Sequence, residues 1–246
     1  MPLYTADALI LRTYKLGEAD RIVVFLTRDR GKKRGVAKGA RRPRSRFAGA
    51  LEPLTEVKVA YFESERRELV GLNFAETVRS PLEFVGGPKG PPLRTLDRTL
   101  DRTLDRTLDD RRGAPSGAPL EYVGYFAELL DEWAQEADAD DRLYRLGASM
   151  LDALAGGVPV EPLARYFEYW LLWLQGVYPE SRGTLSAGAS AFLAASRGLG
   201  PDRVGDVPVD PRVLTELEHV HRALITMHLE KSLKSDRVLR DLRRHL

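Results

Sequence analysis

The stretch from Gly31 to Phe47, GKKRGVAKGARRPRSRF, has the composition of an anion-binding site. It contains eight Lys or Arg residues and no Asp or Glu. Because a phosphate backbone carries regularly spaced negative charges, cations spread along an extended segment can neutralise several phosphates of one strand. The stretch therefore predicts a nucleic-acid path, with an ordinary solvated surface as the alternative. The predicted contact residues are Lys32, Lys33, Arg34, Lys38, Arg41, Arg42, Arg44 and Arg46.

The spacing of these cations predicts how they are presented. On a strand, Lys32, Arg34 and Lys38 project to one side, and Lys33 projects to the other side with the small residues. The glycines would let a nucleic-acid strand approach the backbone closely. Phe47 follows the arginine-rich loop and is either a stacking platform for a base or a plug that closes the end of a barrel.

The charge of the chain is divided unevenly along its length. Residues 1–80 contain 17 Lys or Arg against 10 Asp or Glu, a net charge of +7. Residues 81–246 contain 21 against 26, a net charge of −5. The N-terminal third is therefore the part expected to meet an anion, and Arg12, Lys15 and Arg21 extend its basic patch.

Further cations lie at the C-terminal end of the chain, and aromatic residues lie in a central apolar segment. The cations could contact DNA, although helix C-termini also attract positive charge. The aromatic residues are either core residues or the lining of an apolar groove for a protein partner. The two sets are Lys231, Lys234, Arg237, Arg240, Arg243 and Arg244, and Tyr166, Trp170 and Trp173.

The sequence contains no motif for catalysis. It lacks a glycine-rich phosphate loop, a G-x-S-x-G elbow and an H-E-x-x-H motif. His219, His221 and His228, with Glu218 and Glu230, resemble a metal-binding set, but their spacing on a helix favours core or interface positions. The absence of cysteine excludes disulfides and thiolate metal sites and fits a reducing cytoplasm. We therefore predict no catalytic residue, no metal and no cofactor.

The elements that must position the basic stretch are β-strands. Five short runs with alternating or β-branched apolar residues fall within residues 1–80, and a short irregular insert, SRFAGALEP, separates the third run from the fourth. Five strands in so short a segment suit a small barrel of the OB-fold type. The runs are 6–14, 21–27, 32–40, 55–63 and 68–76.

The rest of the chain has helical periodicity. Residues 81–114 are predicted to be a linker, in which RTLD is repeated four times over 94–109. Residues 115–246 then form a helical domain. Its predicted helices are 120–137, 140–157, 162–179, 210–235 and 236–246. The predicted fold class is α+β with two domains: an N-terminal five-stranded OB-fold barrel, then an α-helical bundle. No apolar run is long enough to span a bilayer, and the N-terminus lacks the pattern of a signal peptide.

The stretch ALILRTYKLGEADRIVVFLTRDRGKKRGVAKGARRPRSRFAGALEPLTEVKVAYFE resembles the N-terminal domain of the RecO family of bacterial recombination mediators. The shared features are the GE-D turn, the glycine before the third strand, the KGARRP-SRF segment and the L-P pair that follows it. RYFEYWLLWLQGVYPE and HRALITMHLEKSLKSDRVLRDL are similar to a helix and to the terminal segment of that family.

This resemblance implies an OB-fold followed by a helical domain, in a cytoplasmic, nucleoid-associated protein of DNA repair and recombination. Members bind single- and double-stranded DNA, anneal complementary strands and act with RecR to load RecA on DNA coated by single-stranded DNA-binding protein. Many members carry a four-cysteine zinc ribbon, but the matching interval here, about 178–210, contains no cysteine. The alternatives are an OB-fold factor that binds RNA or the ribosome, and a protein-interaction scaffold whose basic patch meets an acidic tail.

Overall fold

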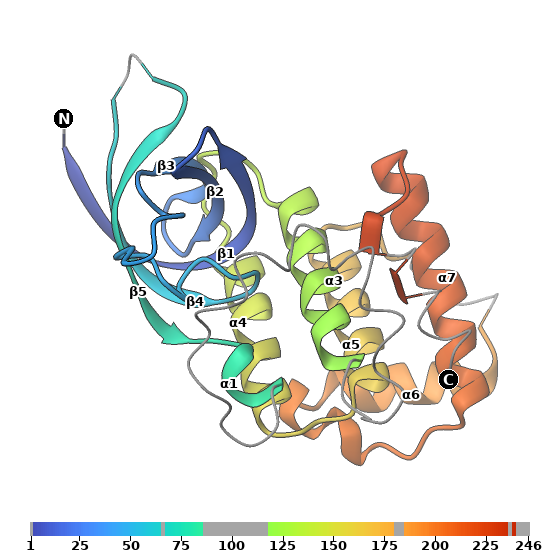
Figure 1. The fold of residues 1–246 in the computed structure, drawn as a ribbon. Coiled ribbons are helices and arrows are strands. Elements are labelled where there is room, and N and C mark those ends of the chain that lie inside the picture. The colour runs from blue at the N-terminus through green and yellow to red at the C-terminus, as the bar shows by residue number, and fades with distance from the viewer. Residues whose placement is uncertain (1, 65–66, 86–117, 180–184, 236–237, 240–246) are drawn as a thin grey trace.

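The computed structural model describes residues 2–64, 67–85, 118–179, 185–235 and 238–239. A β-barrel formed by the N-terminal residues lies beside a group of helices formed by the remainder (Figure 1). The predicted RTLD linker falls mostly outside the described residues, as does most of the predicted helix 236–246. The domain boundaries 1–80, 81–114 and 115–246 therefore stay predictions.

Five strands form a closed barrel in the order β1-β2-β3-β5-β4. Neighbouring strands are antiparallel except for β3 and β5, which pair in parallel over three residues. The predicted α+β fold with an N-terminal OB-fold barrel is confirmed, because the strands close as the sequence pattern indicates. The strand bounds are β1 Leu3–Leu16, β2 Asp20–Thr27, β3 Gly31–Ala37, β4 Glu56–Phe62 and β5 Val70–Arg79.

The alternation of side chains along β1 and β2 gives the barrel two apolar faces. Ile10 and Phe25 point into the barrel and belong to its own core. Leu9, Leu11 and Val24 point outward and belong to the core of the helices. The barrel and the helical domain are thus joined by one continuous apolar contact, which the sequence division into separate domains did not predict.

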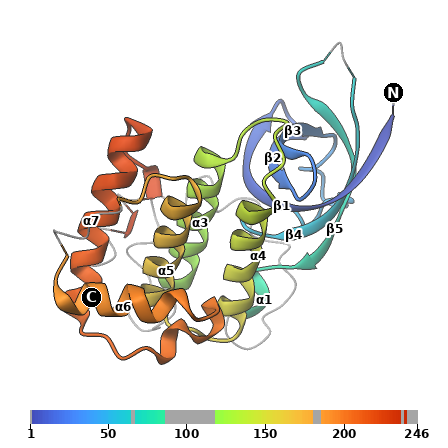
Figure 2. The same ribbon diagram turned by 180° about the vertical axis from the view of Figure 1, so that it is seen from behind.

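The helical domain contacts the barrel through α3 and α4, which lie between the barrel and the α7 helix in both views (Figures 1 and 2). The α4 helix begins as predicted: the Asp140 carboxylate accepts a hydrogen bond from the Leu143 backbone N–H at 2.9 Å. The helices are α1 Leu82–Val85, α3 Ala118–Trp133, α4 Asp141–Ala155, α5 Val160–Leu174, α6 Ala187–Arg197, η2 Pro201–Asp206 and α7 Pro211–Leu229.

A row of carboxylates on α3 strengthens this contact. The Arg12 guanidinium of β1 lies 3.3 Å from Asp131, and within 4 Å of Glu128 and Glu132. The Lys32 amine of β3 donates to the Asp131 backbone carbonyl at 2.5 Å. Because these groups are mostly withdrawn from water, the attraction between them is screened less than on an open surface. The acidic row therefore holds two cations of the barrel against the helical domain.

The turn between β2 and β3 also depends on this contact. Gly31 has a left-handed backbone conformation, with φ of +66°. A Cβ atom at this position would lie 2.2 Å from the Asp138 backbone oxygen. The adjoining Lys32 exchanges backbone hydrogen bonds with Gln135 and Ala137, at 3.0 and 3.2 Å. Glycine is therefore required both by the turn and by the close approach of the segment that joins α3 to α4.

A buried polar cluster connects three helices of the helical domain. Glu168 of α5 accepts hydrogen bonds from Tyr125 of α3 at 2.8 Å and from His221 of α7 at 3.0 Å. Arg165 lies between Glu168 and Glu218, at 2.8 and 3.3 Å. Burial raises the pKa of Glu168, but Arg165, His221 and Tyr125 outweigh that effect and hold it below its ordinary value. The carboxylate is therefore ionised, so the His221 Nδ1 atom carries the proton of this hydrogen bond.

We expect Gly31→Ala to destabilise the protein more than Gly17→Ala. Gly17 also has positive φ, +58°, but a Cβ atom there would meet nothing within 4 Å. Gly17→Ala should thus lose only the conformational term of about 1–2 kcal/mol. Gly31→Ala should lose about 1–3 kcal/mol more, because the backbone of Asp138 must move. Urea unfolding measures both losses, and equal losses would show that the contact with Asp138 contributes nothing.

Acid should destabilise the protein through His221. Burial lowers the pKa of His221 below its ordinary value, and Glu168 opposes only part of that effect. The unfolded chain therefore binds a proton at a higher pH than the folded chain, so stability falls as the pH drops below about 6.5.

The variant His221→Gln should flatten the dependence of the unfolding free energy on pH between about pH 7.5 and about pH 5. The exposed His219 on the same helix provides the control, His219→Gln, which should keep the wild-type slope. Urea unfolding at each pH gives the slopes. The same slope in His221→Gln as in wild type would contradict this account.

Candidate nucleic-acid interface

The arginine-rich segment forms the loop that follows β3. Its residues adopt a series of turns between β3 and β4, and the Phe47 backbone N–H donates to the Ser45 hydroxyl at 3.2 Å. The sequence contains no Asp or Glu from Arg30 to Leu51. Four cations of the loop are exposed: Lys38, Arg42, Arg44 and Arg46. The loop therefore presents concentrated positive charge on a folded scaffold.

Hydrogen bonds hold this loop on the turn between β1 and β2. The Arg41 backbone N–H donates to the Ala19 carbonyl at 2.9 Å, and the Arg41 guanidinium donates to the Gly17 carbonyl at 3.1 Å. The Gly39 N–H donates to the Asp20 carboxylate at 2.7 Å. Arg41 thus acts as an anchor of the loop, while the neighbouring exposed cations face solvent. In OB-folds this turn borders the surface that binds oligonucleotides.

The three cations on β3 are placed differently from the prediction of an open cationic strand. Lys32 is paired with Asp131 and lies against α3. Lys33 lies 2.8 Å from Glu63, and Arg34 lies 3.6 Å from Glu68. The two carboxylates belong to the connection between β4 and β5. Carboxylates distant in sequence therefore neutralise the first part of β3. The predicted DNA contact of Lys32 is not supported, because its amine already holds the helical domain.

The small residues of β3 serve internal packing. A Cβ atom on Gly35 would lie 2.3 Å from Leu72 Cδ1 and 2.8 Å from Val70 Cγ2 of β5. Ala37 is fully buried in the barrel core. The expectation that these residues admit a nucleic-acid strand is corrected, since their side of β3 faces the interior of the barrel.

Phe47 closes the barrel. Its side chain is 2% exposed and packs in the barrel core. The Arg46 guanidinium covers the ring at 5.1 Å from its centroid, a cation–π contact. The stacking role predicted for Phe47 is not supported, because its ring offers no open face to a base. The alternative, a plug at the barrel end, fits the structure.

Sequence reasoning missed Arg67, in the connection between β4 and β5. This exposed arginine lines a pocket together with Lys33 and Arg34. Its signal in the sequence is the basic pair within SERR, between the fourth and fifth predicted strands. OB-folds commonly use this connection in binding, so position in the fold could have marked it.

The histidines are dispersed over the helical domain. His221 is buried in the polar cluster, His219 is exposed, and His228 stacks on Trp133 with centroids 5.6 Å apart. Within the described residues, no group of three His, Asp or Glu side chains is arranged to hold a metal ion. The interval expected to correspond to a zinc ribbon, about 178–210, contains α6 and η2 among its described residues.

Some of the C-terminal cations and of the aromatic residues of the central apolar segment make contacts within the protein. Lys231 pairs with Glu132, and the backbone N–H of Lys234 donates to Glu128. The side chains of Arg237, Arg240, Arg243 and Arg244 lie outside the described residues. Tyr166 is buried and Trp170 is half-buried, whereas Trp173 is 50% exposed.

Comparison with known proteins gives a consistent family match. The family model described as Recombination protein O N terminal matches residues 1–81, and Recombination protein O C terminal matches residues 119–184. A DNA repair protein RecO of Koribacter versatilis is 34% identical over 183 residues, which cover 72% of this chain and 61% of that relative. One of Anaeromyxobacter sp. (strain K) is 32% identical over 195 residues, covering 79% and 63%. The chain therefore spans less than two thirds of the length of these relatives.

A third relative matches a shorter segment more closely. A DNA repair protein RecO of Bifidobacterium adolescentis is 54% identical over 78 residues, which cover 32% of this chain and 31% of that relative. The interval that contains the RTLD repeat lies between the two segments matched by the family models. None of the helices in the described part of the chain has the length and apolar character needed to cross a membrane.

We expect Phe47→Ala to reduce stability by about 3–5 kcal/mol, because it removes a large side chain from the barrel core. Phe47→Leu should restore most of this loss while lacking an aromatic face. Urea unfolding and binding to single-stranded DNA are measured on both variants. Weaker DNA binding by Phe47→Leu at wild-type stability would instead assign the ring to base stacking.

Proposed function

Because this chain belongs to the RecO family, we propose that it is a DNA-binding recombination mediator that anneals single-stranded DNA. The loop from Lys38 to Arg46 is proposed as the main contact with the phosphate backbone. From the family likeness, the proposal includes a wider role for this protein. Together with RecR, it helps to load RecA on DNA that is coated by single-stranded DNA-binding protein. The site of action is the cytoplasm, in association with the nucleoid.

One observation carries this proposal: the exposed cations of the loop are free of nearby carboxylates in sequence and lie on a fixed scaffold. Ordinary protein surfaces mix charges of both signs. Here Lys38, Arg42 and Arg44 are exposed, and none of them is ion-paired with a carboxylate among the described residues. Such a surface suits backbone contacts that do not depend on base sequence and weaken with salt.

Annealing follows from charge neutralisation. Two complementary strands repel each other through their phosphates, and this repulsion is reduced when cations neutralise one of them. The loop is attached to the barrel by Gly39 and Arg41, so its backbone needs little ordering on binding. Lower ordering cost favours affinity. No nucleophile or general base is needed for this activity, so the proposed function is not enzymatic.

Protein partners are proposed to use the helical domain. The exposed Trp173 lies at the end of α5, next to the half-buried Trp170, with ring centroids 5.4 Å apart. Tryptophan is enriched at the centres of protein interfaces. RecR and single-stranded DNA-binding protein are the partners that the family likeness suggests.

The triple variant Lys38→Gln, Arg42→Gln and Arg44→Gln should weaken binding to single-stranded DNA. If each lost phosphate contact contributes about 0.7 to the slope of log affinity against log salt, the slope should flatten by about 2. Fluorescence anisotropy with a labelled oligo-dT over a series of salt concentrations measures this slope, and a strand-annealing assay measures activity.

The matched control replaces three exposed arginines of the helical domain: Arg142→Gln, Arg203→Gln and Arg212→Gln. It removes the same charge and should leave the slope unchanged. A flattened slope in the control, or an unchanged slope in the folded loop variant, would sink the assignment of this loop. Binding to an RNA of matched sequence at the same salt concentration distinguishes a DNA-binding protein from an RNA-binding factor.

A further inference from the structure

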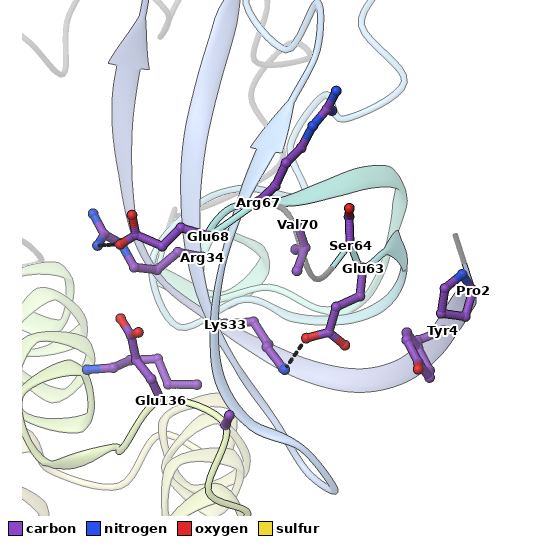
Figure 3. A pocket seen from close by; sticks show the side chains of 12 residues that line it. Pro2, Tyr4, Lys33, Arg34, Glu63, Ser64, Arg67, Glu68, Val70 and Glu136 are labelled. Atoms are coloured by element: carbon purple, nitrogen blue, oxygen red, sulfur yellow. Dashed lines mark hydrogen bonds and ion pairs between the residues drawn. The ribbon is translucent and has the colours of Figure 1, made fainter.

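A pocket with a volume of about 830 Å³ opens where β3 and β5 diverge (Figure 3). The two strands pair only from Gly35 and Val70 onward, so the first half of β3 is separated from β5. The connection between β4 and β5 forms one wall, and the segment after α3 contributes Glu136 and Ala137. The lining residues with ionisable side chains are Tyr4, Lys32, Lys33, Arg34, Arg67, Glu63, Glu68 and Glu136.

Two ion pairs cross this pocket. Figure 3 shows Lys33 directed at Glu63 and Arg34 directed at Glu68. The side chains of Lys33 and Glu63 are 12% and 36% exposed, and those of Arg34 and Glu68 are 40% and 81% exposed. The Arg34–Glu68 pair is exposed, and exposed ion pairs contribute little to stability, so Glu68 can leave Arg34 at small cost. The Lys33 amine is mostly buried and needs an anionic partner, so Glu63 can leave it when a phosphate takes its place.

The pocket and the basic loop lie at the two ends of β3. Lys33 and Arg34 precede Lys38 by four or five residues, which is about 13–17 Å along a strand. Arg67 also lines the pocket and is exposed, but its side chain points away from Lys33 and Glu63 (Figure 3). Tyr4 also lines the pocket, and the Arg30 guanidinium covers one face of its ring at 4.2 Å from the centroid, so that face is not open to a base. Cations and an aromatic ring are the features that bind successive nucleotides of a single strand.

We infer that this pocket is a second subsite for single-stranded DNA, in which Glu63 and Glu68 occupy the positions that phosphates take when a strand binds. The inference rests on the proposed function and extends its DNA path from the loop along β3. In the DNA-free protein the two carboxylates neutralise Lys33 and Arg34, and an incoming strand must displace them. The acidic pair therefore lowers the affinity of the full path for DNA.

The size of the pocket favours a single strand over a duplex. Pockets of about 300–1,000 Å³ accommodate groups of small-molecule size, such as single nucleotides. The mixture of cations, a tyrosine ring and Pro2 and Val70 on the wall also offers contacts to both phosphate and base. A duplex buries its bases and presents only phosphates at such an opening.

The test is the double variant Glu63→Gln and Glu68→Gln, which keeps the side-chain shape and removes both charges. We expect affinity for a labelled oligo-dT to increase about five- to twentyfold, because an incoming phosphate no longer has to displace the carboxylates from Lys33 and Arg34. The size of the gain corresponds to the attraction between opposite charges about 4 Å apart in water. Anisotropy is measured at about 0.15 M salt, where charges more than about 8 Å away are screened. Urea unfolding verifies that the variant is folded.

Two further variants make the result specific. Glu76→Gln with Glu161→Gln removes two exposed carboxylates that do not line the pocket, and should leave affinity within about twofold of wild type. Adding Lys33→Gln and Arg34→Gln to the pocket variant should abolish the gain. A gain that survives this addition, or an equal gain in the control, would overturn the subsite.

The two proposals fail in different ways. If the wild-type chain does not bind oligo-dT, the proposed function fails and the subsite fails with it. If wild type binds, the loop variant binds weakly and Glu63→Gln with Glu68→Gln gives no gain, the function stands and the subsite alone is wrong.

Discussion

The packing of α3 and α4 on the outer face of β1 and β2 is the contact on which the rest of this structure depends. Leu9 and Leu11 alternate with Ala8 and Ile10, so one strand contributes to two cores at once. The approach is close, since a Cβ atom on Gly147 of α4 would lie 2.7 Å from Leu9 Cδ1. This contact makes the barrel and the helices one body and decides which barrel cations stay available.

The same contact divides the basic segment into two groups with different roles. At its start, Lys32 meets Asp131 on α3 and becomes part of the domain interface. At its end, Arg42 and Arg44 are exposed and form no ion pair with a carboxylate of the described residues. Basic residues of this segment are thus either paired inside the structure or left exposed, depending on which carboxylates the fold brings near them. Composition identifies the whole segment but cannot make this division.

Much of the fold was predictable because it depends on local patterns. Runs of alternating or β-branched apolar residues predicted all five strands, although β3 ends at Ala37 and not at residue 40. The α4 helix lies within the predicted bounds 140–157. The site was predictable only in part. The partners of Lys32 and Lys33 lie 99 and 30 residues away in sequence, and no local pattern reveals such pairs. Phe47 was ambiguous for a similar reason. The sequence shows that its ring follows an arginine-rich loop, but it does not show whether the ring is exposed to a base or buried in the barrel core.

The exposed cations of the loop repel one another, so the loop must be stabilised by groups other than its charges. Its anchors fit this requirement. Phe47 inserts an apolar ring into the barrel core, and backbone N–H groups of Gly39 and Arg41 donate to Asp20 and Ala19. None of these contacts pairs a carboxylate with the side chain of an exposed cation of the loop. A loop neutralised by carboxylates, as Lys33 and Arg34 are, would present less positive charge to a phosphate. The fold therefore separates the groups that hold the loop from the exposed cations that we propose as DNA contacts.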